Sequence, residues 1–191
     1  MLAIRDDGPP RLYTRNGHDI SSRHHHISAA LSSLPAERFV LDDELVVLDE
    51  DGRSNFAKLA RGQAGTHYYA FDLLQLGDAD LRQRPLEERK ATLAGLLRDS
   101  EPVRYCDHVV GARCAFFEAV RQAGLEGMVA KRRSSEYVGL SPMIGLRSNA
   151  RELTISLSAD GSQTGLWCST ACSWASSLMA IFGTWAESKT M

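Results

Sequence analysis

The fold is decided by two stretches, FVLDDELVVLDEDG at residues 39–52 and HYYAFDLL at residues 67–74. Both are rich in β-branched and aromatic residues, which favour extended structure. The first stretch ends in the turn sequence DEDG at residues 49–52. We therefore expect strands over residues 39–48 and 67–74.

Working outward toward the start of the chain, residues 1–4 and 11–13 read as two further strands joined through the turn DGPP at residues 7–10. The dipeptide Asn16-Gly17 is a second turn signal. A short helix is expected over residues 27–34, with Ser21 or Ser22 as its cap.

Toward the end of the chain, Pro85 is expected in the first turn of a helix that runs to residue 97. Its apolar face is marked by leucines at positions 86, 93, 96 and 97. A strand over residues 103–106, a helix over 114–123 and a strand over 128–131 follow. Because strands and helices mix without a regular β-α-β rhythm, the sequence predicts an α+β fold.

Bulk properties exclude several classes of protein. The 191 residues carry a formal net charge of -2, so nothing global indicates nucleic-acid binding, although one groove could still be basic. None of the four cysteines forms a CxxC pair, and the three consecutive histidines at 24–26 point in different directions on a helix, so no metal centre is expected from either group. The chain shows no signal peptide and no apolar run of membrane-spanning length, so we expect a cytoplasmic location.

The composition changes after about residue 138. All three tryptophans lie in the last stretch, charged residues become sparse, and serine recurs. Residues 167–174 follow neither a strand period nor a helix period. We therefore divide the chain into a domain at residues 1–138 and a tail at residues 139–191, which we expect to be poorly ordered.

Four short motifs carry polar residues that could do chemistry: TRNG at 14–17, LDDEL at 41–45, YAFDLL at 69–74 and EGMVAK at 126–131. Each has an ordinary structural alternative. The first could be a hairpin exit, the second an edge strand with its acids facing water, the third a buried strand with an end acid, and the fourth a loop before an exposed strand.

Together, and in this order, the motifs resemble those of ATP-dependent DNA ligases, especially the bacterial ligases of non-homologous end joining. The resemblance covers residues 1–137 almost continuously, including the connectors PLEERK at 85–90 and YCDHVV at 105–110. It implies an α+β nucleotidyltransferase (ATP-grasp-like) core that uses ATP and Mg²⁺ on nicked or broken DNA, together with end-joining repair proteins.

The resemblance also implies a role for six residues. Arg15 would contact the nucleotide, Glu44 would serve the ribose and the divalent metal, and Phe71 would lie beside the adenine ring. Val129 would pack on the other face of the base. Glu126 would be a second acid near the metal and phosphates, and Lys131 would face the triphosphate.

Two family motifs are absent. The family's nucleophile is the lysine of Lys-x-Asp-Gly, but the lookalike here starts with Arg5, which stays protonated and cannot attack ATP. It also falls in the hairpin turn after the expected motif, so we expect the lysine motif upstream of Met1. The final motif, Trp-x-Lys-x-Lys, does not follow residue 137.

A shift of reading frame accounts for the second absence. Residues 142–150 can be encoded CCG ATG ATT GGC TTA AGA TCA AAT GC, which from its third base reads Asp-Asp-Trp-Leu-Lys-Ile-Lys-Cys. Residues 182–189 can be encoded so that the same phase reads Arg-Tyr-Val-Gly-Gly-Val, which is similar to a strand of the OB-fold domain that follows in these ligases.

The sequence therefore predicts an incomplete ligase core at residues 1–138 without an OB-fold domain, unable by itself to form the enzyme-adenylate. Two alternatives stay open. One is a noncatalytic remnant that binds DNA or a repair partner, and the other is an RNA ligase or capping-type nucleotidyltransferase, which shares the motifs.

Overall fold

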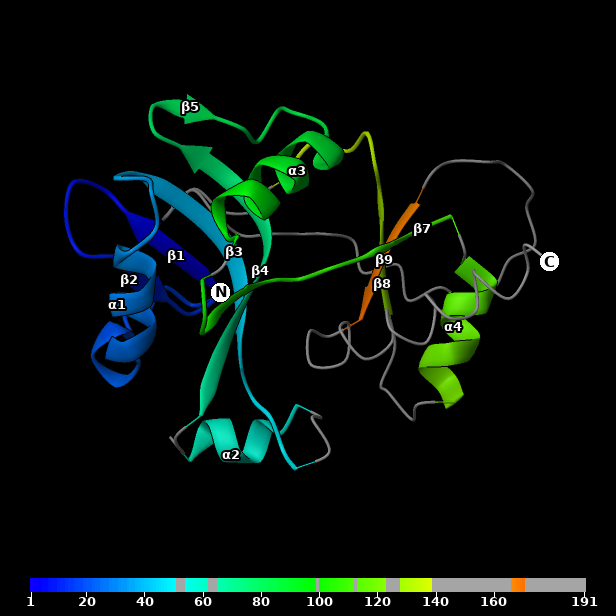
Figure 1. Cartoon of the computed structure of the whole chain (residues 1–191), viewed down its shortest axis with the longest axis horizontal. Helices are drawn as coiled ribbons and strands as arrows, with labels where there is room; N and C mark the ends of the chain where they lie inside the picture. The colour runs from blue at the N-terminus through cyan, green and yellow to red at the C-terminus, as the bar shows by residue number, and fades with distance from the viewer. Residues whose placement is uncertain are drawn as a thin grey trace.

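The computed structural model describes residues 1–50, 54–61, 65–98, 100–111, 113–122, 128–138 and 166–170. These residues form a six-stranded sheet, a three-stranded sheet and helices packed beside them (Figure 1). The mixture agrees with the predicted α+β class. No helix in these ranges is long and apolar enough to cross a lipid bilayer.

The first sheet has the strand order β2-β1-β3-β4-β5, with β6 beside β4. The strands are β1 (Leu2–Arg5), β2 (Arg11–Tyr13), β3 (Phe39–Val47), β4 (Thr66–Leu76), β5 (Ala79–Asp80) and β6 (Val103–Tyr105). All neighbours are antiparallel except β4 and β6, which run parallel. The parallel pair is joined through α3 (Leu86–Leu96), as a crossover connection requires.

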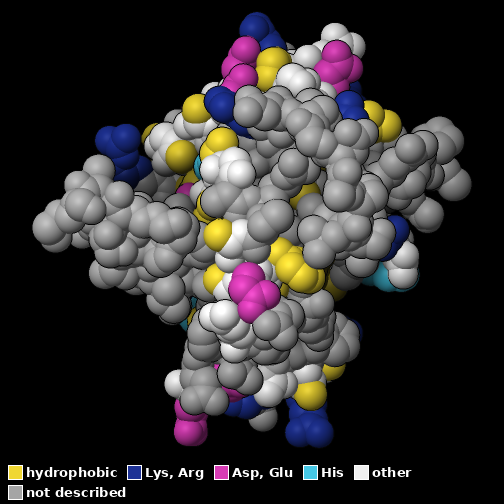
Figure 2. Space-filling view, turned by 90° about the vertical axis from the view of Figure 1, so that its right-hand side faces the viewer, with side chains coloured by type: hydrophobic (Ala, Val, Ile, Leu, Met, Phe, Trp, Pro, Cys, Tyr) yellow, Lys and Arg dark blue, Asp and Glu magenta, His cyan; other side chains and the backbone are white. Residues whose placement is uncertain are grey.

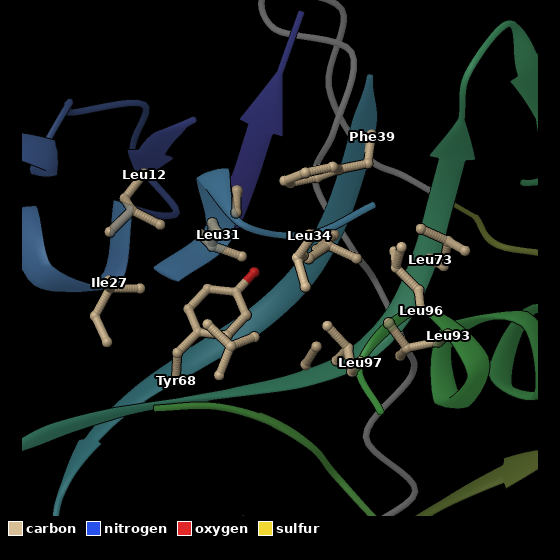
Figure 3. Packing of buried hydrophobic residues seen from close by; sticks show 14 of the residues in the cluster. Leu12, Ile27, Leu31, Leu34, Phe39, Tyr68, Leu73, Leu93, Leu96 and Leu97 are labelled. Carbon is tan, nitrogen blue, oxygen red and sulfur yellow. The ribbon is translucent and has the colours of Figure 1, made fainter. Parts of the chain in front are cut away.

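The main core covers one face of this sheet. Helix α1 (His25–Ser32) and the end of α3 pack their leucines and isoleucine against buried residues of β1, β3 and β4 (Figure 3). The fully buried members include Leu12, Ile27, Leu31, Phe39, Tyr68, Leu73 and Leu93. The opposite face of the sheet carries smaller apolar clusters.

The second sheet consists of β7 (Val109–Val110), β9 (Leu166–Thr170) and β8 (Met128–Arg132), in that order and antiparallel. Helix α4 (Arg113–Gln122) lies beside it, and α2 (Phe56–Ala60) lies in the connection between β3 and β4 (Figure 1).

Strand β9 corrects one expectation. The absence of a period over residues 167–174 predicted no strand, yet residues 166–170 pair with both β7 and β8. The pairing is made by main-chain groups, which need no alternating side-chain pattern. The rest of the tail lies outside the described residues.

The cap prediction for the first helix was also wrong. Ser21 lies in a 3₁₀ turn, η1 (Ser21–Arg23), and α1 begins after His24, whose side chain makes no capping hydrogen bond. The Ser21 hydroxyl instead accepts from the main-chain N–H of Leu12 at 2.9 Å and donates to Asp19 at 2.6 Å. It therefore ties η1 to β2.

Candidate functional site

The register of the first sheet places two predicted site residues at neighbouring positions. One row of paired residues crosses the sheet through Tyr13, Leu2, Asp42 and Asp72. Glu44 lies two residues after this row on β3, and Phe71 lies one residue before it on β4. Because β3 and β4 run in opposite directions, both lie on the same side of the row.

Arg15 lies in a tight turn after β2. The turn is closed by the Gly17 N–H, which donates to the Thr14 carbonyl at 2.8 Å, and by the Thr14 N–H, which donates to His18 at 3.0 Å. Gly17 has φ of 80°, a conformation that glycine adopts without strain. The turn leaves Arg15 exposed to solvent.

Glu44 is the least buried residue of β3, which is otherwise buried along its length. β3 lies between β1 and β4, so the alternative reading of its acids as an edge strand is wrong. Alternation places Glu44 on the face of Val46, opposite the main-core residue Leu45. Val46 packs with Tyr69 and Phe71, so Glu44 and Phe71 share one face.

Phe71 occupies an irregularity in β4. The partners along β3 and β4 pass from Asp42 with Asp72 to Asp43 with Ala70, which leaves Phe71 without a partner in that ladder. A β-bulge of this kind turns a side chain away from the regular pleat, and bulges are common beside active sites. The half-buried Phe71 ring packs beside Val46 and the other residues of its cluster.

Val129 and Lys131 stand two residues apart on β8, so they share a face of the second sheet. Both are half-buried, whereas Ala130 between them is buried. Burial raises the pKa of Asp42, and the positive charge of Lys131 is among the groups that oppose this rise.

One contact joins the segment after β8 to the first sheet. The Tyr137 hydroxyl donates to Asp42 at 3.2 Å, and the Tyr137 N–H donates to the Arg82 carbonyl at 2.7 Å. Tyr137, in the segment after β8, therefore contacts the face of the first sheet that carries Glu44 and Phe71. Glu126 lies outside the described residues.

The described residues contain no group of three His, Cys, Asp or Glu side chains that could hold a metal ion. Glu44 is the one predicted metal ligand within the described ranges. A single carboxylate suits Mg²⁺, which keeps several of its waters. On the face shown in Figure 2, described lysines and arginines lie at separate points around the rim and do not form one patch.

Sequence reasoning missed two buried basic residues of α3. Arg89, which is 2% exposed, makes a paired contact with Asp72: Nε to Oδ1 and Nη2 to Oδ2, each at 2.8 Å. Lys90, which is 5% exposed, donates to main-chain carbonyls of Phe71 and Cys106. A signal was present: positions 86, 89, 90 and 93 form one helical stripe, so two basic residues stand among core leucines.

Comparison with known proteins identifies the family. Residues 2–140 match the family model described as the ATP dependent DNA ligase domain. The chain belongs to this DNA ligase family.

Curated relatives agree with this family. The multifunctional non-homologous end joining protein LigD of Pseudomonas aeruginosa is 41% identical over 145 residues, covering 72% of this chain and 17% of that protein. A probable DNA ligase of Streptomyces coelicolor is 34% identical over 152 residues, covering 70% and 29%. The chain therefore spans less than a third of either relative.

Solved structures give the same answer. The ligase domain of LigD from M. tuberculosis has a TM-score of 0.63 at 31% identity, and mycobacterial DNA ligase D complexed with ATP and MES has a TM-score of 0.60 at 29% identity. Each match covers 72% of this chain and 46% of the solved chain. The predicted resemblance to bacterial end-joining ligases and the nucleotidyltransferase fold are confirmed.

Proposed function

We propose that this chain is part of a catalytic domain that joins DNA ends at the expense of ATP, in double-strand break repair. The observation that supports the proposal is that Glu44 and Phe71 share one face of the first sheet, beside Val46 and Tyr69. An acid and an aromatic ring on this face suit the metal and the base of ATP, and Lys131 would face its phosphates.

The base would lie between Phe71 and Val129, which come from different sheets. Arg15, in its exposed turn, would reach the nucleotide from the β2 side, and a guanidinium forms well-directed hydrogen bonds to ribose or phosphate oxygens. Lys131 would offset the negative charge of the triphosphate. Glu44, with Glu126, would hold Mg²⁺, which supplies further positive charge to the phosphates when bound.

The 191 residues contain no Lys-x-Asp-Gly sequence. The Arg5 guanidinium, which begins the nearest lookalike, donates to the main-chain carbonyls of Ser32 and Ala36 at 3.0 Å, so it serves α1 and the loop after it. Arg5 also pairs with Phe39, at the opposite end of β3 from Glu44. We infer that this chain binds ATP without becoming adenylylated, and that any joining of DNA needs a lysine from another segment.

Binding and labelling with ATP test these two statements separately. Isothermal titration with Mg-ATP should show weak binding that Phe71→Ala and Lys131→Met each reduce, because the first removes stacking and the second removes a positive charge. Lys58→Met, on α2, removes an equal charge elsewhere and should leave the affinity unchanged. Incubation with radiolabelled ATP should leave the chain unlabelled.

Each contrary result would contradict a different part of the proposal. An acid-labile covalent AMP adduct on a lysine would contradict the inferred lack of adenylylation. Absence of ATP binding, or binding that neither Phe71→Ala nor Lys131→Met weakens, would contradict the proposed site.

A further inference from the structure

Lys90 is a buried cation in the wall of the proposed nucleotide site. Its Nζ donates to the Cys106 carbonyl at 2.9 Å and to the Phe71 carbonyl at 3.3 Å. The ammonium also lies 4.6 Å from the centre of the Tyr105 ring. Burial of a lysine is costly unless its donors are satisfied, so these contacts fix its position closely.

The location of Lys90 follows from a gap beside β4. On that side, β6 pairs with residues 68–70 and β5 pairs with residues 75 and 76. Among the described strands, none pairs with residues 71–74 on that side. Helix α3 covers this gap, and Lys90 supplies a hydrogen bond to the first carbonyl within it.

The main chain of Phe71 therefore lacks the regular strand pairing of its neighbours. The residue has no Cα partner in the β3–β4 register and lies in the gap between β6 and β5. The described hydrogen bond to its carbonyl comes from Lys90. Since the direction of a side chain follows its main chain, the ammonium helps to set the angle of the Phe71 ring.

Resting on the proposed function, we propose that Lys90 is a positioning residue for base recognition: it holds the bulged Phe71 main chain so that the ring lies parallel to a bound adenine. The contact does not reach the phosphates. It therefore affects the part of the binding free energy that comes from the base.

The side chains of Tyr105 and His108 lie close to Lys90 and add no positive charge to its surroundings near pH 7. The Tyr105 hydroxyl and His108 Nδ1 are 3.1 Å apart. Burial, followed by the positive charge of Lys90, lowers the pKa of His108 to about 4. His108 is consequently neutral near pH 7 and adds no second positive charge to this cluster.

The test compares a ligand that has a base with one that has none. Mg-ATP and inorganic tripolyphosphate are titrated into the full chain and into Lys90→Met, with Lys58→Met as the charge-matched control. We expect Lys90→Met to weaken ATP binding about tenfold, the size of one charge-assisted hydrogen bond, and to leave tripolyphosphate binding unchanged. Lys58→Met should change neither.

A purely structural role would give a different pattern. If Lys90→Met weakens both ligands equally, or weakens neither, the positioning role is wrong. If the unaltered chain binds ATP no more tightly than tripolyphosphate, the proposed function fails and the positioning role fails with it. Should Lys90→Met not fold by circular dichroism, Lys90→Gln, which keeps an amide donor of shorter reach, provides the same comparison.

Discussion

Asp43 is buried among apolar residues of the main core, and it is 1% exposed. Its carboxylate lies 3.7 Å from the Met1 amino group and interacts with the Tyr68 hydroxyl. Burial raises the pKa of Asp43 from 3.8 to about 7. The residue lies beside Glu44 in the chain but faces the opposite side of the sheet, so it belongs to the core and not to the site.

This carboxyl group should make stability depend on pH. Between pH 3.8 and about 7 the folded chain binds a proton that the unfolded chain has lost, so the free energy of unfolding falls as pH rises through this window. Asp43→Asn cannot ionise. It should match the unaltered chain near pH 4 and be more stable at pH 8, by on the order of a few kcal/mol. Urea unfolding at both pH values measures the difference, and a difference independent of pH would contradict this account.

The site residues show what a motif can and cannot predict. Glu44, Phe71 and Lys131 were predicted from their order along the chain, and the structure places Glu44 and Phe71 on one face of the first sheet. Lys90 was not predicted, because a lysine in a helix normally points to solvent and its acceptors here are main-chain carbonyls. Main-chain carbonyl acceptors cannot be identified from the sequence.

At the scale of elements, α3 connects parts that are distant in sequence. Arg89 pairs with Asp72 of β4 and donates to the Ser135 carbonyl at 3.0 Å. The Glu87 N–H donates to the Arg133 carbonyl at 3.1 Å, beyond β8. The helix therefore fixes the strand that carries Phe71 relative to the segment that follows Lys131.

The buried pair should be far more important for stability than an exposed pair of the same chemistry. Asp72→Asn leaves the Arg89 guanidinium buried without its counter-charge, which should cost about 3–5 kcal/mol. Asp80→Asn is the matched control. Arg82 contacts Asp80 with similar paired geometry, but their side chains are 45% and 53% exposed, so the loss should stay below about 1 kcal/mol. Equal losses in urea unfolding would contradict the proposed importance of burial.

Most long elements were predictable from local pattern. The strands at β1 to β4, β6 and β8 and the helices α1, α3 and α4 agree with the expected ranges to within a few residues. The short elements α2, β5 and β7 were not predicted, because two to five residues contain too little periodicity. The bulge at Phe71 could not be predicted from the sequence either, because it depends on the register of two strands.

At the scale of the whole molecule, the family match ends at residue 140, close to the change of composition at residue 138. We retain the proposal that the tail at residues 139–191 is read out of frame. If it is, the gene's codons for residues 142–150, read from the third base of the first, should encode Trp-Leu-Lys-x-Lys. Sequencing the gene decides the point, and codons that give no Trp-x-Lys-x-Lys in either alternative frame would refute it.

The position of β9 at the centre of the second sheet has a consequence during synthesis of the chain. The first sheet has all its strands once Tyr105 is made, whereas the second needs Thr170, roughly 65 residues later. At about 5–20 residues per second, this interval lasts roughly 3–13 s on the ribosome. During this interval β7, and β8 once Arg132 is made, lack their shared neighbour, so nascent chains are most prone to associate through open strand edges then.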